Sequence, residues 1–343
     1  MKLFIKSVLV LAFTSGILHA GGFVAGRDLG DGRDLRFGIS VGQITDFSGM
    51  VEETTRSLYD VTGETWKQDT AESYNLDDFN LEDAYTTFGL TFEKAWKYFT
   101  IQLNGSYMSI SSDAVAQRDY YLTVGSVNYD GQEYEHLKIP AGSPFSYDFT
   151  GASIEANLLF TPFTFRPVDV LRVTPLLGIG LFGVVGQYEI DAGESTGIYP
   201  YQNPLEDFVV GGKADGPMGF GMPEYGGGLE FRLGHQDGVN LVIHGYYAFF
   251  QYDGSTDWLT SSDHREKNAE IDHQSARLRV YAEFPLREGR SWLIGAQYQR
   301  IESEGMITST ATDPEEILDK RERFDKEFEF GMTMFNAMVG LTF

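Results

Sequence analysis

The sequence predicts an all-β fold: a transmembrane, antiparallel, up-and-down β-barrel of about ten strands, with long extracellular loops and short periplasmic turns. Three observations predict it. Apolar residues recur at every second position along most of the chain, which is the spacing of one face of a β-strand. Long and short connections alternate between these segments, and aromatic residues gather beside the short ones. A soluble β-sandwich has no reason to place every long loop at one end, whereas a transmembrane barrel does so.

The strands follow one another as segments with an apolar face of period two. In one of them Phe99, Ile101 and Leu103 alternate with Thr100 and Gln102. In order, the apolar faces cover Leu35–Val41, Thr86–Phe92, Phe99–Tyr107, Ala152–Phe160, Leu171–Leu181, Tyr225–Leu233, Leu241–Phe249, Ala276–Phe284, Trp292–Tyr298 and Phe335–Phe343. The seventh segment is apolar on both faces, so the sequence does not decide which of its faces points into the barrel. Because the strand number is even, both ends of the barrel lie on the periplasmic side.

Aromatic residues support the same architecture independently. A transmembrane barrel carries a girdle of aromatic side chains at each membrane interface. The girdle beside the short turns is predicted to contain Phe92, Trp96, Phe99, Phe160, Phe231, Phe284, Trp292 and Phe343, and the opposite girdle Tyr107, Tyr225, Tyr247 and Phe335.

The first residues have the layout of a secretory signal peptide. Lys2 and Lys6 precede an apolar run, and a small residue, Ala20, stands at a plausible cleavage point. We therefore predict a signal peptide over 1–20, a barrel domain over 21–343, and a short periplasmic segment over 21–34. The chain has no cysteine, which excludes a lipid-anchored lipoprotein and any disulfide.

The net charge of −24 makes nucleic acid an unsuitable partner. Most of the negative charge falls in the predicted extracellular loops, as in "YNLDDFNLED" over residues 74–83. Such loops could attract cations, or divalent ions could bridge them loosely to anionic lipopolysaccharide. A merely solvated surface fits as well. The chain has no calcium loop of the D-x-D-x-D-G kind, and we predict no cofactor and no metal site. Asp130-Gly131 predicts a tight hairpin that extends its two neighbouring strands.

The inward faces carry charges of both signs in equal number. Because an isolated buried charge is costly, these side chains should pair inside the barrel. The predicted lumen-charge network contains Arg36, Arg172, Arg232, Arg277, Arg279, Glu93, Glu155, Glu224, Glu230 and Glu283. A barrel of eight strands is already filled by side chains, so we expect a salt-bridged and largely plugged interior. The inward-facing glycines leave room for the alternative, a narrow cation-preferring porin for small solutes.

The last segment, "NAMVGLTF", resembles the C-terminal strand of bacterial outer-membrane β-barrel proteins. In that family the closing aromatic strand is recognised by the assembly machinery, so the resemblance implies an assembly signal at Val339, Leu341 and Phe343. It also implies a Gram-negative type of envelope and outer-membrane lipid and lipopolysaccharide as neighbours.

Ten strands with long acidic loops are also similar in layout to the omptins, a family of outer-membrane proteases. The resemblance implies an aspartate pair from the early loops, here Asp113 and Asp119, and an Asp–His pair from the fourth loop, here Asp263 and His264. The close Asp-x-Asp pair is missing, however, and Asp263 and His264 lack the one-residue spacer of the family. In Asp272-His273 adjacent side chains would point to opposite faces of a strand.

Three functions remain at this point. The first, which we favour, is a non-enzymatic envelope protein whose acidic extracellular loops bind an unknown ligand or contact other surfaces. The second is the narrow porin, and the third the omptin-like rim protease.

Overall fold

The structure is a computed structural model that describes residues 22–28, 34–60, 65–74, 84–200, 207–235, 238–255, 265–286, 289–311 and 322–343. The predicted signal peptide, Asp263 and His264 lie outside the described residues. Within them, no helix is long and apolar enough to cross a membrane.

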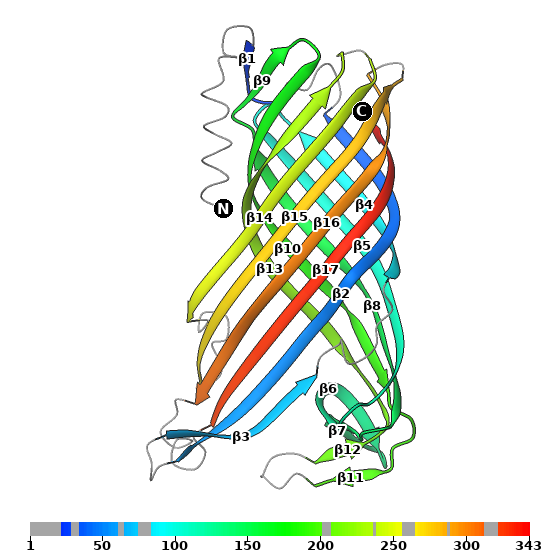
Figure 1. Ribbon diagram of the computed structural model, residues 1–343, viewed down its shortest axis with the longest axis vertical. Coiled ribbons are helices and arrows are strands. Elements are labelled where there is room, and N and C mark those ends of the chain that lie inside the picture. Colours follow the sequence, from blue (N-terminus) through cyan, green and yellow to red (C-terminus); the bar gives the residue numbers. More distant parts are fainter. Residues whose placement is uncertain are drawn as a thin grey trace.

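Ten strands form a closed antiparallel barrel, as predicted (Figure 1). Each of them is hydrogen-bonded to the next, and pairing of the last strand with the first closes the ring. In order around the ring they are β2 (Leu35–Asp60), β4 (Ala84–Ala95), β5 (Phe99–Val115), β8 (Pro144–Phe160), β10 (Leu171–Asp191), β13 (Lys213–Leu233), β14 (Asn240–Ser255), β15 (Arg265–Pro285), β16 (Ser291–Ala311) and β17 (Glu322–Thr342).

The short connections lie at one end of the barrel, here called the turn end, together with both ends of the described chain. There the backbone amide of Phe343 donates to the carbonyl of Leu35 at 2.8 Å, and the amide of Leu35 donates back at 3.2 Å. The N-terminal strand β1 (Gly22–Ala25) pairs with β9 (Phe163–Val168) at the same end. The final residue therefore fastens the closing strand to the first one.

The opposite end, here called the loop end, carries β3 (Thr65–Tyr74), β6 (Tyr120–Tyr129), β7 (Gln132–Ile139), β11 (Gly197–Tyr199) and β12 (Phe208–Val210) (Figure 1). The predicted hairpin at Asp130-Gly131 joins β6 to β7. Both turn residues have positive φ, 50° and 77°, which is the left-handed conformation that a two-residue turn of this type requires.

The strands extend much further toward the loop end than predicted. The expected loop from Ile44 onward is in fact the continuation of β2 to Asp60, and β15 begins at Arg265 rather than near Ala276. The prediction ended each strand where its outward apolar face ended. Where burial is described, as along β5, β10, β15 and β16, the strand continues there with the polarity of its two faces exchanged.

This exchange of polarity is clear within β5. Over Phe99–Tyr107 the exposed positions are mostly apolar, whereas buried positions such as Gln102 are polar. From Met108 onward the buried positions are mostly apolar, including Ile110, and the exposed positions are mostly polar, including Ser111. The turn half of the barrel is thus apolar outside and polar inside, and the loop half is the reverse.

The exposed apolar side chains of the turn half form a continuous surface, here called the apolar belt. Its large members are Phe37, Ile39, Val41, Phe88, Leu90, Phe92, Phe99, Ile101, Leu103, Tyr107, Ile154, Leu158, Phe160, Leu177, Ile179, Leu181, Tyr225, Phe231, Leu233, Leu241, Leu278, Val280, Phe284, Trp292, Ile294, Phe335, Val339 and Phe343. They include most of the aromatic residues predicted for the two girdles, and these are exposed.

The barrel is closed within the belt and separates into two facing sheets above it. The β4–β5 ladder reaches Thr87↔Met108, and the β13–β14 ladder reaches Tyr225↔Phe249, although β5, β13 and β14 all continue. One sheet then consists of β5, β8, β10 and β13, and the other of β14 to β17 with β2 (Figure 1). An apolar core that includes Phe149, Phe182, Ile301 and Phe330 fills the loop half.

Prolines explain why β13 leaves β14. The β10–β13 ladder keeps its register without a break, although Pro217 and Pro223 lie within it. Proline has no N–H to donate, so both nitrogens must point to the other edge of β13. Pro223 stands two residues before Tyr225 and therefore on the same edge. The next residue on that edge therefore could not donate a hydrogen bond to β14.

Candidate functional site: the interior of the barrel

The turn half of the interior holds a dense network of ion pairs. Glu93 lies at its centre and accepts from Arg36 and from the Gln102 side chain, the latter at 2.8 Å. Arg36 also lies 3.4 Å from Glu283, which in turn pairs with Arg232. The side chains are almost completely buried. The strands place these residues together because each occupies an inward position near the turn end.

Arg27 completes this network from outside the barrel strands and was not among the predicted lumen charges. It follows β1 and enters the barrel, where it donates to Glu93 at 3.1 Å and to the Thr100 hydroxyl at 2.9 Å. It also pairs with Glu230. The predicted periplasmic segment 21–34 therefore does more than precede the first barrel strand, because its Arg27 side chain contributes a positive charge to the interior.

A second group of charges lies closer to the middle of the barrel. Arg277 pairs with Glu155 and, at 2.8 Å, with Glu224. Asn104 donates to Glu155 at 2.9 Å, and Gln299 donates to it at 3.1 Å. All the lumen charges predicted from the sequence are thus buried in the interior, and most of them form ion pairs.

Two of the predicted arginines bind neutral oxygens. Arg172 donates to the Asn240 side-chain oxygen at 2.7 Å. Arg279 donates to Asn104 at 2.7 Å and to Gln297 at 3.0 Å. The amide side chains therefore complete the network where carboxylates do not reach.

A histidine links the polar and apolar parts of the interior. The two ring nitrogens of His273 lie 2.6 Å from the Ser303 hydroxyl and 3.0 Å from Glu224, and Phe182 stacks on the ring. Serine, histidine and glutamate are the residue types of an acyl-transfer triad. Here all three are at most 3% exposed, so a substrate has no access. The arrangement holds β13, β15 and β16 together at the change of polarity.

Asp263 and His264 lie outside the described residues, so the structure places only the other two candidate protease residues and the Asp272-His273 couple. Asp113 lies on the exposed face of β5. Asp119 forms an ion pair with Lys138 at 2.8 Å and accepts from the Ala141 amide at 2.9 Å, and these bonds lower the pKa of its carboxyl group. His273 is fully buried, whereas the neighbouring Asp272 lies on the outer surface and accepts from Gln251. Their divergence agrees with the period-two prediction.

Two other groups of predicted residues can be placed. Val339 and Phe343 lie on the exposed face of β17, and Leu341, which shares that face, is partly buried. As for metals, the parts of the chain that the structure describes contain no cluster of three or more His, Asp or Glu side chains that could hold an ion.

Above the belt the outer surface is acidic, and we call its part on β15–β17 the outer wall. It includes a depression of about 470 Å³. Its charged lining residues are Asp272, Arg300, Glu302, Glu304 and Glu329. Arg300 pairs with Glu302, so the remaining carboxylates give this surface a net negative charge.

Comparison with known proteins gives only distant similarity. No protein-family model and no curated protein matches the sequence. Among solved structures, the outer membrane protease OmpT from Escherichia coli is 10% identical, with 90% of this chain and 97% of that chain covered and a TM-score of 0.35. The Pseudomonas putida toluene transporter TodX is 9% identical, with 91% and 90% covered and a TM-score of 0.25. A FadL homologue of Pseudomonas aeruginosa is 8% identical, with 90% of each chain covered and a TM-score of 0.22. These values are too low for an inference about function.

Proposed function

We propose that this chain is an integral protein of a bacterial outer membrane, with a sealed barrel, that acts by binding at its extracellular surface and catalyses no reaction. The observation that carries the proposal is the exchange of polarity along the long strands, such as β5.

The belt is the part that lipid would cover. Exposed apolar patches on soluble monomers rarely exceed a few hundred Å², whereas here the apolar surface surrounds the barrel. Only a hydrocarbon environment favours apolar side chains outside and paired charges inside. Beyond Tyr107, Ala276 and Tyr298 the exposed face becomes polar, which is the arrangement expected in water. The membrane boundary therefore lies at these residues.

The orientation follows from the connections. Short turns of outer-membrane barrels lie in the periplasm and long loops lie outside the cell. The turn end accordingly faces the periplasm, and the loop half projects from the cell surface.

The interior is suited to sealing rather than conduction. Ion pairs centred on Glu93 and Glu155 occupy the membrane-embedded half, and the apolar core around Phe330 occupies the projecting half. A water-filled pore would hydrate these charged groups, yet Glu93 and Arg36 are 3% and 5% exposed. These observations favour the plugged barrel over the narrow porin.

The acidic outer wall supplies the binding surface of the proposal. Its carboxylates would attract cationic groups of a partner, or divalent ions that link the protein to anionic lipopolysaccharide. The attraction should weaken with salt, because the side chains are exposed and screening is effective there.

Single-channel recording of the purified, refolded chain tests the sealed barrel. We expect no conductance steps, together with a folded form that resists SDS until it is heated. Reproducible steps would establish the porin instead. A chain that stays soluble without detergent would contradict the membrane location itself.

A further inference from the structure

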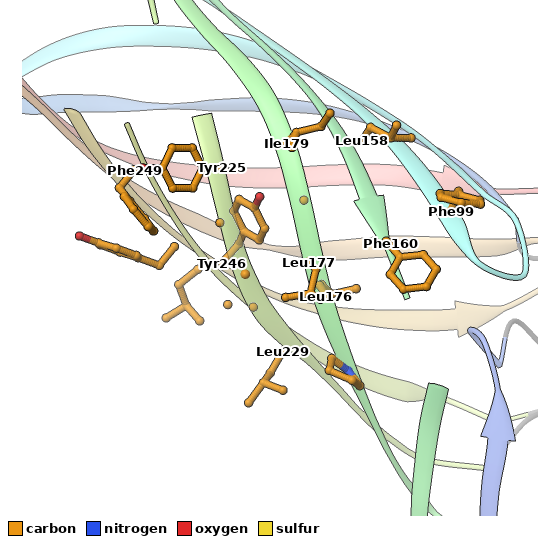
Figure 2. Close-up of a pocket in the computed structure, with 18 of the residues that line it drawn as sticks. Phe99, Leu158, Phe160, Leu176, Leu177, Ile179, Tyr225, Leu229, Tyr246 and Phe249 are labelled. Atoms are coloured by element: carbon orange, nitrogen blue, oxygen red, sulfur yellow. The ribbon is translucent and has the colours of Figure 1, made fainter. Parts of the chain in front are cut away.

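A large groove lies on the outside of the apolar belt, where β8, β10, β13 and β14 pass side by side (Figure 2). Its volume is about 1210 Å³. Ligand sites are typically ~300–1,000 Å³, so the groove is large even by that measure. Among the residues that the structure describes, no Asp, Glu, Lys or Arg lines it.

Glycines on neighbouring strands create the hollow. Gly227 and Gly245 occupy outward positions of β13 and β14, where the belt elsewhere carries mostly larger side chains. In the ladder Gly227 pairs with Tyr247, and Gly245 pairs with Leu229, so the two glycines lie diagonally across neighbouring positions. A Cβ atom built on Gly245 would meet nothing within 4 Å. The missing side chain of Gly245 is thus open space within the groove.

Aromatic pairs mark the two ends of the groove. The rings of Phe99 and Phe160 lie 5.5 Å apart near the turn end. The rings of Tyr225 and Phe249 lie 4.3 Å apart at the other end, where the β13–β14 ladder stops (Figure 2). Beside the latter pair, the Tyr247 hydroxyl donates to Gln274 at 2.8 Å. The groove therefore runs from one aromatic girdle to the other.

We propose that this groove binds an acyl chain of a membrane phospholipid, an inference that rests on the membrane location proposed above. The groove is continuous with the belt, so the molecules that cover the belt also reach it. Its lining suits a hydrocarbon chain, because the polar groups there are tyrosine hydroxyls and backbone. The groove reaches both girdles, so an acyl chain that enters from an interface can lie along it. A lipid chain in the groove contacts the barrel on several sides, whereas lipid elsewhere on the belt contacts it on one side.

Filling the groove at Gly245 tests the proposal directly. Gly245→Leu adds a side chain where a Cβ meets nothing, so we expect the variant to fold. Gly105→Leu is the matched control. Gly105 faces outward on β5, away from the groove, and its Cβ would approach only the Ser153 carbonyl, at 3.9 Å. Gly245→Ala provides a smaller change should the leucine variant fail to fold.

The measurement is native mass spectrometry of the full chain, refolded in detergent with palmitoyl-oleoyl phosphatidylethanolamine and then transferred to lipid-free detergent. We expect one phospholipid to stay bound to the parent chain and to Gly105→Leu. We expect Gly245→Leu to retain it at least tenfold less often, and Gly245→Ala to lie between them.

Three results would overturn the proposal, and they differ from one another. Equal lipid retention by all variants would mean ordinary annular lipid. A dimer seen for the parent and Gly105→Leu but lost in Gly245→Leu would mean that a second copy fills the groove. A chain that is soluble without detergent and does not enter vesicles would remove the proposed membrane location and the lipid site together.

Discussion

Phe220 of β13 and Phe330 of β17 meet edge to face, with ring centroids 4.7 Å apart. The two residues belong to different sheets of the loop half, and Phe330 also contacts Phe47 of β2 with its ring. This contact shows how the projecting half is held together. Where the ladder between β13 and β14 has ended, side-chain packing across the interior joins the two sheets.

Replacing Phe330 by alanine should therefore weaken the loop half. Phe330 is 1% exposed, and truncation of a buried phenylalanine typically lowers the free energy of unfolding by about 3–5 kcal/mol. Urea unfolding of the refolded chain in micelles, followed by tryptophan fluorescence, measures the change.

Phe335→Ala is the control on the same strand. Phe335 points outward and is 53% exposed, so in a micelle its removal leaves no internal cavity. We expect a clearly smaller loss than for Phe330→Ala. Equal losses would show that the loop half has no packed core of its own.

The number and order of the barrel strands followed from the sequence because the apolar belt imposes a strict period of two. The inward charges followed for the same reason, since Arg277 and Glu230 each alternate with belt residues. Beyond the belt the same period continues with its faces exchanged. A prediction that followed the outward apolar face therefore stopped at Ala276 and assigned the rest of β15 to a loop.

Two parts of the interior could not be predicted in this way. Arg27 lies in a segment without strand periodicity, and only the folded chain shows that it turns into the barrel. Ser303 lay in a predicted loop, so its contact with His273 was not foreseen. Such contacts depend on the register between several strands. The sequence of a single strand does not determine that register.

Glu93→Gln should destabilise the barrel strongly. Glu93 is 3% exposed and pairs with both Arg27 and Arg36. The variant therefore removes one charged partner from each guanidinium group and leaves Glu230 and Glu283 as the remaining carboxylates beside them. Removing one partner of a buried pair costs about 3–5 kcal/mol. The midpoint of urea unfolding should fall accordingly.

Glu302→Gln is the matched control, because Glu302 and its partner Arg300 are both more than half exposed. Exposed pairs contribute only about 0–1 kcal/mol. If the two variants were equally stable, the network around Glu93 would not support the barrel.

The base of the β6–β7 hairpin should loosen in acid. The hydrogen bond from Lys138, with a second from the Ala141 amide, lowers the pKa of Asp119 below its usual value. A lowered folded pKa means that the contribution of this contact is fully present above the unfolded pKa of ~3.9, declines below it, and is lost as the pH falls through the lower folded pKa. Hydrogen exchange at the Ala141 amide, corrected for its intrinsic rate, should therefore accelerate below that pH.

Asp119→Asn should make this amide exchange faster at neutral pH and remove the acid dependence. Asp113→Asn, at an exposed position on β5, should leave both unchanged. An unaltered pH profile in Asp119→Asn would mean that another group anchors the hairpin.

The position of the membrane boundary can be tested by introducing an arginine at one of two outward positions that lie at different heights along the barrel. Val280 lies midway along the outward apolar face of β15, whereas Ser111 is outward and exposed on β5 beyond Tyr107. An arginine facing lipid near the bilayer midplane costs about 2–4 kcal/mol. A surface substitution in water usually changes stability by about 0.5 kcal/mol or less. In lipid vesicles we therefore expect Val280→Arg to lower the free energy of unfolding by the larger amount and Ser111→Arg to have little effect. Similar losses for both variants would mean that lipid extends over Ser111, and negligible losses for both would mean that lipid does not cover the belt at Val280.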